Sequence, residues 1–127
     1  MSTEDSTPET VGVVSGWGMN NEDYSVGEKP DVLQSVEVPI WDNEVCQSSY
    51  KGLMKSNKIY ESQMCAGEKN GGFDSCWGDS GGPMVNKQTG ILIGVVSTGV
   101  GCARKGLPGI YTRVSRYTKW IKGNVKY

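Results

Sequence analysis

The sequence predicts an all-β domain built from short strands and followed by a C-terminal helix. Glycine accounts for 18 of the 127 residues, a content that favours a turn-rich fold over a helical bundle. Short apolar runs alternate with turn residues at the intervals typical of a β-barrel or β-sandwich. A chain of this length is expected to form one domain that buries roughly two thirds of its unfolded surface.

Strand signals occur in six segments, at residues 11–17, 36–40, 63–66, 83–85, 91–96 and 109–114. In the second segment, apolar Val36, Val38 and Ile40 alternate with other residue types, which is the pattern of a half-buried strand. Pro39 has no N–H to donate, so we expect this strand to lie at an edge or to contain a bulge. The fifth segment is almost continuously apolar, which suits a strand buried on both faces.

Three further segments have a predicted local structure. Residues 1–10 are polar and acidic and contain a proline, so we interpret them as a solvated tail or linker. Asp42 suits the N-cap of a short helix, and Ser115 is expected to cap a second helix near the C-terminus. The second helix would have an apolar face formed by Tyr117, Trp120, Ile121 and Val125.

The charge and hydrophobicity of the chain indicate which classes of binding partner to expect. The formal net charge is −1 with both signs spread along the chain, so neither nucleic acid nor an anionic membrane surface is expected. No run approaches the roughly 18 apolar residues that a membrane span needs. The polar start has no apolar signal-peptide region, so for an exported protein we expect upstream sequence to be missing.

The four cysteines indicate two disulfides. No two cysteines form a CxxC pair and the chain has no histidine, so zinc is not favoured, and we expect no metal or cofactor. An even number of cysteines in a small, glycine-rich chain indicates an oxidising, extracellular compartment. Three connectivities are open from the sequence alone. The alternative is a cytosolic protein with four free thiols.

The stretch DSCWGDSGGP presents Ser80 among glycines. A serine nucleophile needs an exposed oxygen, a base that accepts its proton, and backbone N–H donors directed at the developing oxyanion. Gly78, Gly81 and Gly82 let the chain bend so that N–H groups converge, and Pro83 fixes the exit. Without a histidine, the usual base is missing.

Two alternatives exist for this stretch. GDSGG also matches the G-x-S-x-G nucleophile elbow, which requires a strand before the serine and a helix after it. The glycines and proline that follow Ser80 oppose a helix, and no βαβ alternation surrounds it, so we reject the elbow. The other alternative is a plain turn, because Gly, Asp and Ser are common turn residues.

The wider context resembles the trypsin-like serine proteases of the chymotrypsin family. The motifs that carry the resemblance are DSCWGDSGGP, VVSGWG (13–18), MCAG (64–67), the SerThrGly before GVGC (97–102), PGIYTRV (108–114) and YTKWI. They run from about residue 11 to the end and cover only the C-terminal one of the family's two β-barrels. The resemblance implies a six-stranded antiparallel Greek-key barrel with a C-terminal α-helix over residues 11–127. Residues 1–10 would then be a polar tail or interdomain linker.

The resemblance also implies a role for individual residues. Ser80 matches the nucleophile, and the N–H groups of Gly78 and Ser80 match the oxyanion hole. Asp79 is similar to the carboxylate that accepts the new N-terminal ammonium group after zymogen cleavage. Asp74 matches the base of the specificity pocket, where a carboxylate selects Lys or Arg, although it could instead be a solvated loop acid. The disulfides implied pair Cys46 with Cys65 and Cys76 with Cys102.

Further positions match the substrate-binding part of the family's site. The positions are Ser75, Ser97, Thr98, Gly99 and Gly109. Gly99 and Gly109 match the pocket walls, where a side chain would block entry. The segment from Ser97 to Gly99 resembles the strand that pairs with the substrate backbone.

Several positions depart from the family pattern. The catalytic His and Asp are absent, so we expect the chain to be inactive alone. Trp77 stands where a polar residue is more common, and it would form an aromatic wall or cover the pocket rim. Thr98 replaces a frequent Trp, which should widen one subsite. Gly12 and Asn86 occupy positions where many members have a disulfide.

The resulting hypothesis is the C-terminal half of a secreted serine-type endopeptidase that cleaves after Lys or Arg. Its expected partners are protein or peptide substrates with Lys or Arg, the missing N-terminal barrel of the same protease, and protein inhibitors. A non-catalytic binding module or decoy that retains the basic-residue pocket is the main alternative. A purely structural domain, in which Ser80 has no role, is the third.

Overall fold

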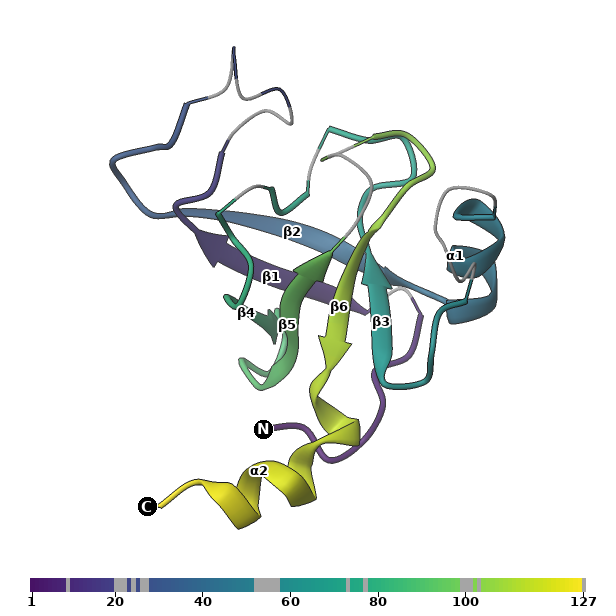
Figure 1. Cartoon of the computed structure of the whole chain (residues 1–127), viewed down its shortest axis with the longest axis vertical. Helices are drawn as coiled ribbons and strands as arrows, with labels where there is room; N and C mark the ends of the chain where they lie inside the picture. The colour runs from purple at the N-terminus through teal and green to yellow at the C-terminus, as the bar shows by residue number, and fades with distance from the viewer. Residues whose placement is uncertain are drawn as a thin grey trace.

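The computed structural model describes residues 1–8, 10–19, 23, 25, 28–51, 58–72, 74–76, 78–98, 102 and 104–126. Six antiparallel strands form a closed barrel in the order β1-β2-β3-β6-β5-β4 (Figure 1). The strands are β1 (Val11–Gly16), β2 (Gln34–Trp41), β3 (Gln63–Ala66), β4 (Pro83–Asn86), β5 (Leu92–Thr98) and β6 (Gly109–Arg113). Because β6 returns to pair with β3 after the β4–β5–β6 meander, the connection is a Greek key. The predicted barrel is confirmed.

The longest described register joins β1 to β2, from Val11 opposite Pro39 to Gly16 opposite Gln34. The β2–β3 ladder begins at Ile40, directly after Pro39, so the missing N–H of the proline interrupts no pairing with β3. Alternate strand residues fill the barrel interior, since successive side chains of a strand point to opposite faces. The buried cluster comprises Val14, Val38, Ile40, Met64, Ala66, Met84, Ile93, Val96 and Tyr111.

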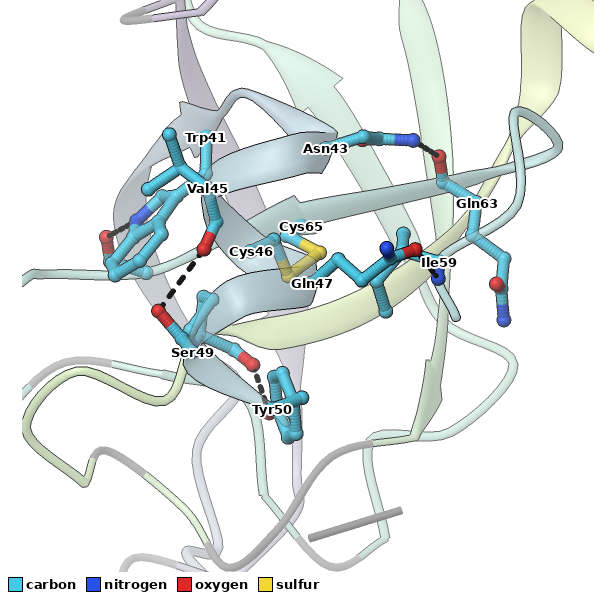
Figure 2. Close-up of a disulfide and its surroundings, with 12 residues drawn as sticks. Trp41, Asn43, Val45, Cys46, Gln47, Ser49, Tyr50, Ile59, Gln63 and Cys65 are labelled. Atoms are coloured by element: carbon cyan, nitrogen blue, oxygen red, sulfur yellow. Dashed lines mark hydrogen bonds between the residues drawn. A yellow bond between two sulfur atoms is a disulfide. The ribbon is translucent and has the colours of Figure 1, made fainter. Parts of the chain in front are cut away.

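Helix α1 (Asn43–Ser49) packs on the outside of the barrel, beside β3 (Figure 1). Its N-cap is Asp42, whose Oδ1 accepts a hydrogen bond from the N–H of Glu44 at 2.8 Å, as the sequence predicts. The Cys46–Cys65 disulfide joins α1 to β3 (Figure 2). A second buried cluster surrounds this disulfide and contains Trp41, Cys46, Tyr50, Ile59, Cys65 and Ile110.

The C-terminal segment differs from its prediction at the start of the helix. A 3₁₀ turn, η1 (Val114–Arg116), follows β6, and helix α2 (Thr118–Asn124) begins only after it. Ser115 therefore lies inside η1 and does not cap α2, so the predicted cap is wrong. The Ser115 hydroxyl instead donates a hydrogen bond to Oδ1 of Asp5 at 2.6 Å. Because η1 continues directly from the strand, the Ser115 hydroxyl donates to this distant carboxylate and does not accept a hydrogen bond from a backbone N–H of α2.

The N-terminal segment lies against the C-terminal one (Figure 1). The N–H of Ser2 donates to the carbonyl of Leu92 at 3.0 Å, and the Thr118 hydroxyl donates to the carbonyl of Ser2 at 2.9 Å. Arg116 forms an ion pair with the Asp5 carboxylate at 2.6 Å. Although mostly exposed, this segment is thus tied to the barrel. No helix in the described part of the chain is long and apolar enough to cross a membrane.

Candidate active site

Ser80 is exposed on a series of tight turns between Cys76 and Gly82. The N–H of Asp79 donates to the carbonyl of Cys76 at 3.0 Å, and the N–H of Gly82 donates to the carbonyl of Asp79 at 2.9 Å. Gly78 has φ +96°, a backbone conformation that residues other than glycine rarely adopt. The serine side chain is therefore presented by a short, internally hydrogen-bonded loop.

Strand β5 holds this loop in place. The N–H of Gly81 donates to the carbonyl of Val96, and the N–H of Val96 donates to the carbonyl of Gly82, both at 2.9 Å. A second attachment is the Cys76–Cys102 disulfide, whose Cα atoms are 5.3 Å apart. Both disulfides pair as the resemblance implied. The loop is thus fixed to the barrel on both sides of Ser80, as a site that needs precise positioning requires.

The backbone N–H groups on either side of Asp79 have no hydrogen-bond partner among the described residues. In the described part of the chain, neither the N–H of Gly78 nor that of Ser80 donates a hydrogen bond, while the intervening N–H of Asp79 does. Both residues are exposed. Two unengaged donors beside an exposed hydroxyl are the arrangement that can bind an oxyanion.

The Asp79 side chain turns inward toward the end of β1. Its Oδ1 accepts a hydrogen bond from the N–H of Gly18 at 2.9 Å, and its Oδ2 accepts one from the N–H of Cys76 at 2.8 Å. A Cβ atom at Gly16 would lie 2.0 Å from Oδ1, and one at Gly18 would lie 2.5 Å from Cγ. The VVSGWG motif therefore supplies glycines because the carboxylate passes directly over their Cα atoms.

A cavity of about 420 Å³ lies beside this carboxylate. Its walls are Val14, Gly16, Gly18, Met19, Pro30, Gln34, Ser35, Val36, Gly72, Asp74 and Asp79. Val14, Met19, Pro30 and Val36 contribute apolar side chains, and the carboxylates of Asp74 and Asp79 contribute negative charge. A small cationic group with an apolar attachment fits this lining best.

Asp74, which also lines this cavity, lies beside Gly109. Oδ1 of Asp74 accepts a hydrogen bond from the N–H of Ser75 at 2.8 Å. A Cβ atom at Gly109 would lie 2.8 Å from this same oxygen. The structure thus brings together three of the predicted substrate-binding residues, and it explains why a glycine is needed at the start of β6.

Tyr111 completes this group, although the sequence analysis did not identify it. Its hydroxyl lies 3.0 Å from Oγ of Ser75, and its ring is fully buried. Burial, together with the negative charge of Asp74, raises the pKa of Tyr111 well above its usual value, so the phenol stays neutral. The sequence feature that could have identified Tyr111 is its position two residues after Gly109, because residues two apart in a strand lie on the same face.

Ser97 and Thr98 form an exposed end of β5. Val96 pairs with Tyr111 and Thr98 pairs with Ile110, so Ser97 is an extra residue in the ladder. The described β4–β5 ladder reaches only Val95. Beyond Val96, no described strand covers this edge of β5, which leaves it open to an added strand. Gly99 and Trp77, also identified from the sequence, lie outside the described residues.

Comparison with known proteins agrees with this geometry. A family model for trypsin matches residues 1–121. Trypsin-1 of Astacus astacus is 47% identical over 114 residues, which cover 88% of this chain and 45% of that protein. Trypsin I-P1 of Gallus gallus is 47% identical over 91% of this chain and 43% of its own length. Serine protease 1 of Homo sapiens is 46% identical over 89% of this chain and 42% of its own length.

This chain therefore spans less than half the length of the curated relatives that it matches. The family model nevertheless matches nearly all of the chain's residues. This chain belongs to the trypsin family of serine proteases.

Proposed function

We propose that this chain is the C-terminal half of a secreted endopeptidase that cleaves peptide bonds after Lys or Arg. Residues 11–127 would form the C-terminal barrel, and residues 1–10 would be the linker from the first barrel. The observation that carries the proposal is the exposed Ser80 flanked by two N–H groups that have no partner in the described part of the chain. These are the nucleophile and the oxyanion donors of acyl transfer.

The proposed reaction begins with attack by Oγ of Ser80 on the carbonyl carbon of the scissile bond. The Ser80 proton passes to a base on the first half of the protease, since this chain contains no histidine. The carbonyl oxygen becomes an oxyanion that accepts hydrogen bonds from the N–H groups of Gly78 and Ser80. The amine then leaves with the proton that the base returns to it, and water releases the acyl group. Alone, the chain is expected to be inactive.

Selection of Lys or Arg is assigned to Asp74. The proposal is supported by the approach of Gly109 to its carboxylate, because the absence of a side chain there leaves room for a long substrate side chain. Ser75 and the neutral Tyr111 hydroxyl add polar groups beside the carboxylate. Ser97 and Thr98 would pair with the substrate backbone, and Gly99 would form the second glycine wall.

Asp79 is assigned to activation. After cleavage of a zymogen, the new N-terminal ammonium group would enter the cavity of about 420 Å³ and pair with this carboxylate. The apolar wall, which includes Val14, Met19 and Val36, suits the first side chain of the new N-terminus. Such an ion pair would link cleavage to the geometry of the Gly78–Ser80 donors.

The first barrel of the same protease is the proposed partner. Large apolar side chains are exposed at the end of β1, the start of β2 and along α2: Trp17, Val32, Leu33, Tyr117, Trp120 and Val125. Exposed apolar groups of this size are typical of surfaces that bind another protein. Secretion is proposed from the two disulfides, and protein inhibitors would bind across the same site as substrates.

A non-catalytic decoy is the second candidate, favoured by the combination of an ordered Asp74 site with the absence of histidine. To separate the two, the chain can be joined to the first half of Trypsin-1 from Astacus astacus and assayed on arginine-containing peptides. We expect cleavage that Ser80→Ala abolishes and Asp74→Asn strongly reduces. A folded joined protein that binds arginine peptides without cleaving them would support the decoy, and one that does neither would overturn both.

A further inference from the structure

The side chain of Trp41 supplies a hydrogen-bond donor that the backbone of β2 lacks. One residue beyond the end of β3, the N–H of Gly67 donates to the carbonyl of Pro39 at 3.0 Å. In an antiparallel pair of this kind the opposing residue returns a hydrogen bond, but a proline has no N–H to donate. The indole N–H of Trp41 donates to the carbonyl of Gly67 instead, at 2.8 Å (Figure 2). Residues of β2 therefore hold both backbone polar groups of Gly67.

This substitute hydrogen bond is buried. Trp41 is only 7% exposed, and Gly67 is also buried. The indole packs in the second buried cluster, together with Tyr50 and the Cys46–Cys65 disulfide. Because water has little access to a buried carbonyl, loss of the indole donor would be costly unless the end of β3 moved. Trp41 therefore fixes the position of Gly67.

Gly67 packs against the residues that border Asp74. A Cβ atom at Gly67 would lie 3.2 Å from Cα of Pro108 and 3.8 Å from the backbone nitrogen of Gly109. The β3–β6 ladder pairs Gly109 with Ala66, the residue before Gly67. Gly109 also approaches Asp74, since a Cβ atom at Gly109 would lie 2.8 Å from Oδ1 of that carboxylate. Movement of Gly67 would thus reach Asp74 through one intervening residue.

We propose that Trp41 is a positioning residue for the Asp74 carboxylate. Its indole N–H holds the Gly67 carbonyl, which keeps Gly109 at its distance from Asp74. The loop that presents Ser80 has separate hydrogen bonds to β5, so we expect the reacting groups to stay in place when this contact is lost. The inference rests on the proposed function for one point alone, that the Asp74 site receives the Lys or Arg side chain of a substrate.

Amide hydrogen exchange in the 127-residue chain tests the positioning itself. The N–H of Ser75, which donates to Oδ1 of Asp74 at 2.8 Å, reports whether that carboxylate is in place. Trp41→Phe keeps an aromatic ring but removes the N–H, and we expect exchange at Ser75 to become about fivefold faster. Adding Pro39→Ala to this variant restores a backbone N–H opposite Gly67 and should return exchange to nearly its original rate.

Two controls separate positioning from a general loss of stability. Trp120→Phe makes the same substitution on α2, where the side chain is 67% exposed and its indole N–H has no hydrogen bond to a described residue. Ile59→Val removes a methyl group from the buried cluster that contains Trp41, so it should lower the free energy of unfolding. Neither control should change the exchange of Ser75 relative to that of other buried amides.

Binding of a small cation separates this inference from the proposed function. The probe is p-aminobenzamidine, a fluorescent aromatic amidinium, and its dissociation constant is measured for each variant. We expect Trp41→Phe to weaken binding about fivefold, the added Pro39→Ala to restore it, and Asp74→Asn to abolish it. If Asp74→Asn binds the probe as well as the original chain does, the pocket assignment of the proposed function fails, and the exchange of Ser75 still decides the role of Trp41.

Equal exchange of Ser75 in Trp41→Phe and Trp120→Phe would overturn the inference. Faster exchange that the added Pro39→Ala does not reverse would also overturn it, because the indole would then act through packing alone. In the joined protein, Trp41→Phe should raise KM for arginine peptides and leave kcat unchanged. A loss confined to kcat would place the effect at the Ser80 loop and would contradict the assignment to Asp74.

Discussion

Oδ1 of Asp79 accepts a hydrogen bond from the N–H of Gly18 at 2.9 Å, across 61 residues of sequence. This bond connects the loop that presents Ser80 to the end of β1. The other carboxylate oxygen accepts from Cys76, so the side chain has a backbone donor on each side. The position of the loop that presents Ser80 therefore depends on these two hydrogen bonds to the Asp79 carboxylate.

Asp79→Asn should destabilise the fold, because an amide has only one acceptor oxygen and would leave one of the two backbone donors unpaired. Loss of a hydrogen bond to a charged group costs about 1–3 kcal/mol. Urea unfolding measures the change, with exposed Asp31→Asn as the control for the loss of one negative charge. Equal stability of the two variants would show that the Gly18 and Cys76 hydrogen bonds contribute nothing.

Gly16→Ala should be destabilising by about 1–3 kcal/mol, since its Cβ would lie 2.0 Å from Oδ1 of Asp79. Gly123→Ala in α2 is the matched control: its Cβ would meet no atom within 4 Å. Alanine is the better helix former, so the control should gain about 0.5–1 kcal/mol. Thermal unfolding of both variants tests the difference, and a stable Gly16→Ala protein would contradict the close packing of Asp79 on β1.

Tyr111 should make the folded protein sensitive to alkaline pH. Its pKa is raised in the fold by burial and by the charge of Asp74, while the unfolded chain loses the same proton near pH 10. Above pH 10 the folded state therefore binds more protons than the unfolded state, and stability falls by about 1.4 kcal/mol per pH unit. Tyr111→Phe should remove this component. The measurement is the free energy of unfolding of both proteins between pH 8 and pH 11. If it falls with pH equally steeply in the unchanged protein and in Tyr111→Phe, Tyr111 does not cause the alkaline loss of stability.

Asp5 should contribute a small amount of stability that is lost in acid. Its pKa is lowered to about 2, chiefly by the hydrogen bond from Arg116 and then by that from Ser115. Because the unfolded carboxyl has a pKa of about 3.9, the contribution is complete above pH 4 and disappears as the pH falls to about 2. The ion pair is largely exposed, so screening limits the effect to about 0.5 kcal/mol.

Asp5→Asn should therefore flatten the acid dependence of stability over that range. Glu4→Gln, one residue earlier, is the control, because within the described residues the Glu4 carboxylate forms no ion pair. Urea unfolding at pH 5 and pH 2.5, at low and high salt, gives the comparison. An unchanged acid dependence in Asp5→Asn would mean that the N-terminal segment is not held by this carboxylate.

Local patterns in the sequence were sufficient for most of the fold. Each predicted strand overlaps an observed one, and Asp42 caps α1, because strand alternation and an N-cap depend on residues close together in the chain. The sequence left three disulfide connectivities open, and the resemblance to the family implied the pairing that the structure has. Gly12 and Asn86, predicted to occupy a position where relatives have a disulfide, are direct partners on β1 and β4. Met84 fills the space beside Gly12, with Sδ 2.6 Å from a Cβ built there.

The sequence by itself determined the strand pattern, the first helix cap and the motif around Ser80. Only the tertiary structure decided which distant groups meet that motif: the Tyr111 hydroxyl at Ser75 and the β1 glycines under Asp79. It also decided that the Ser115 hydroxyl donates to Asp5 and does not accept a hydrogen bond from a backbone N–H of α2. The physical reason is that these contacts follow from the strand order of the closed barrel, which brings together residues that no local periodicity relates.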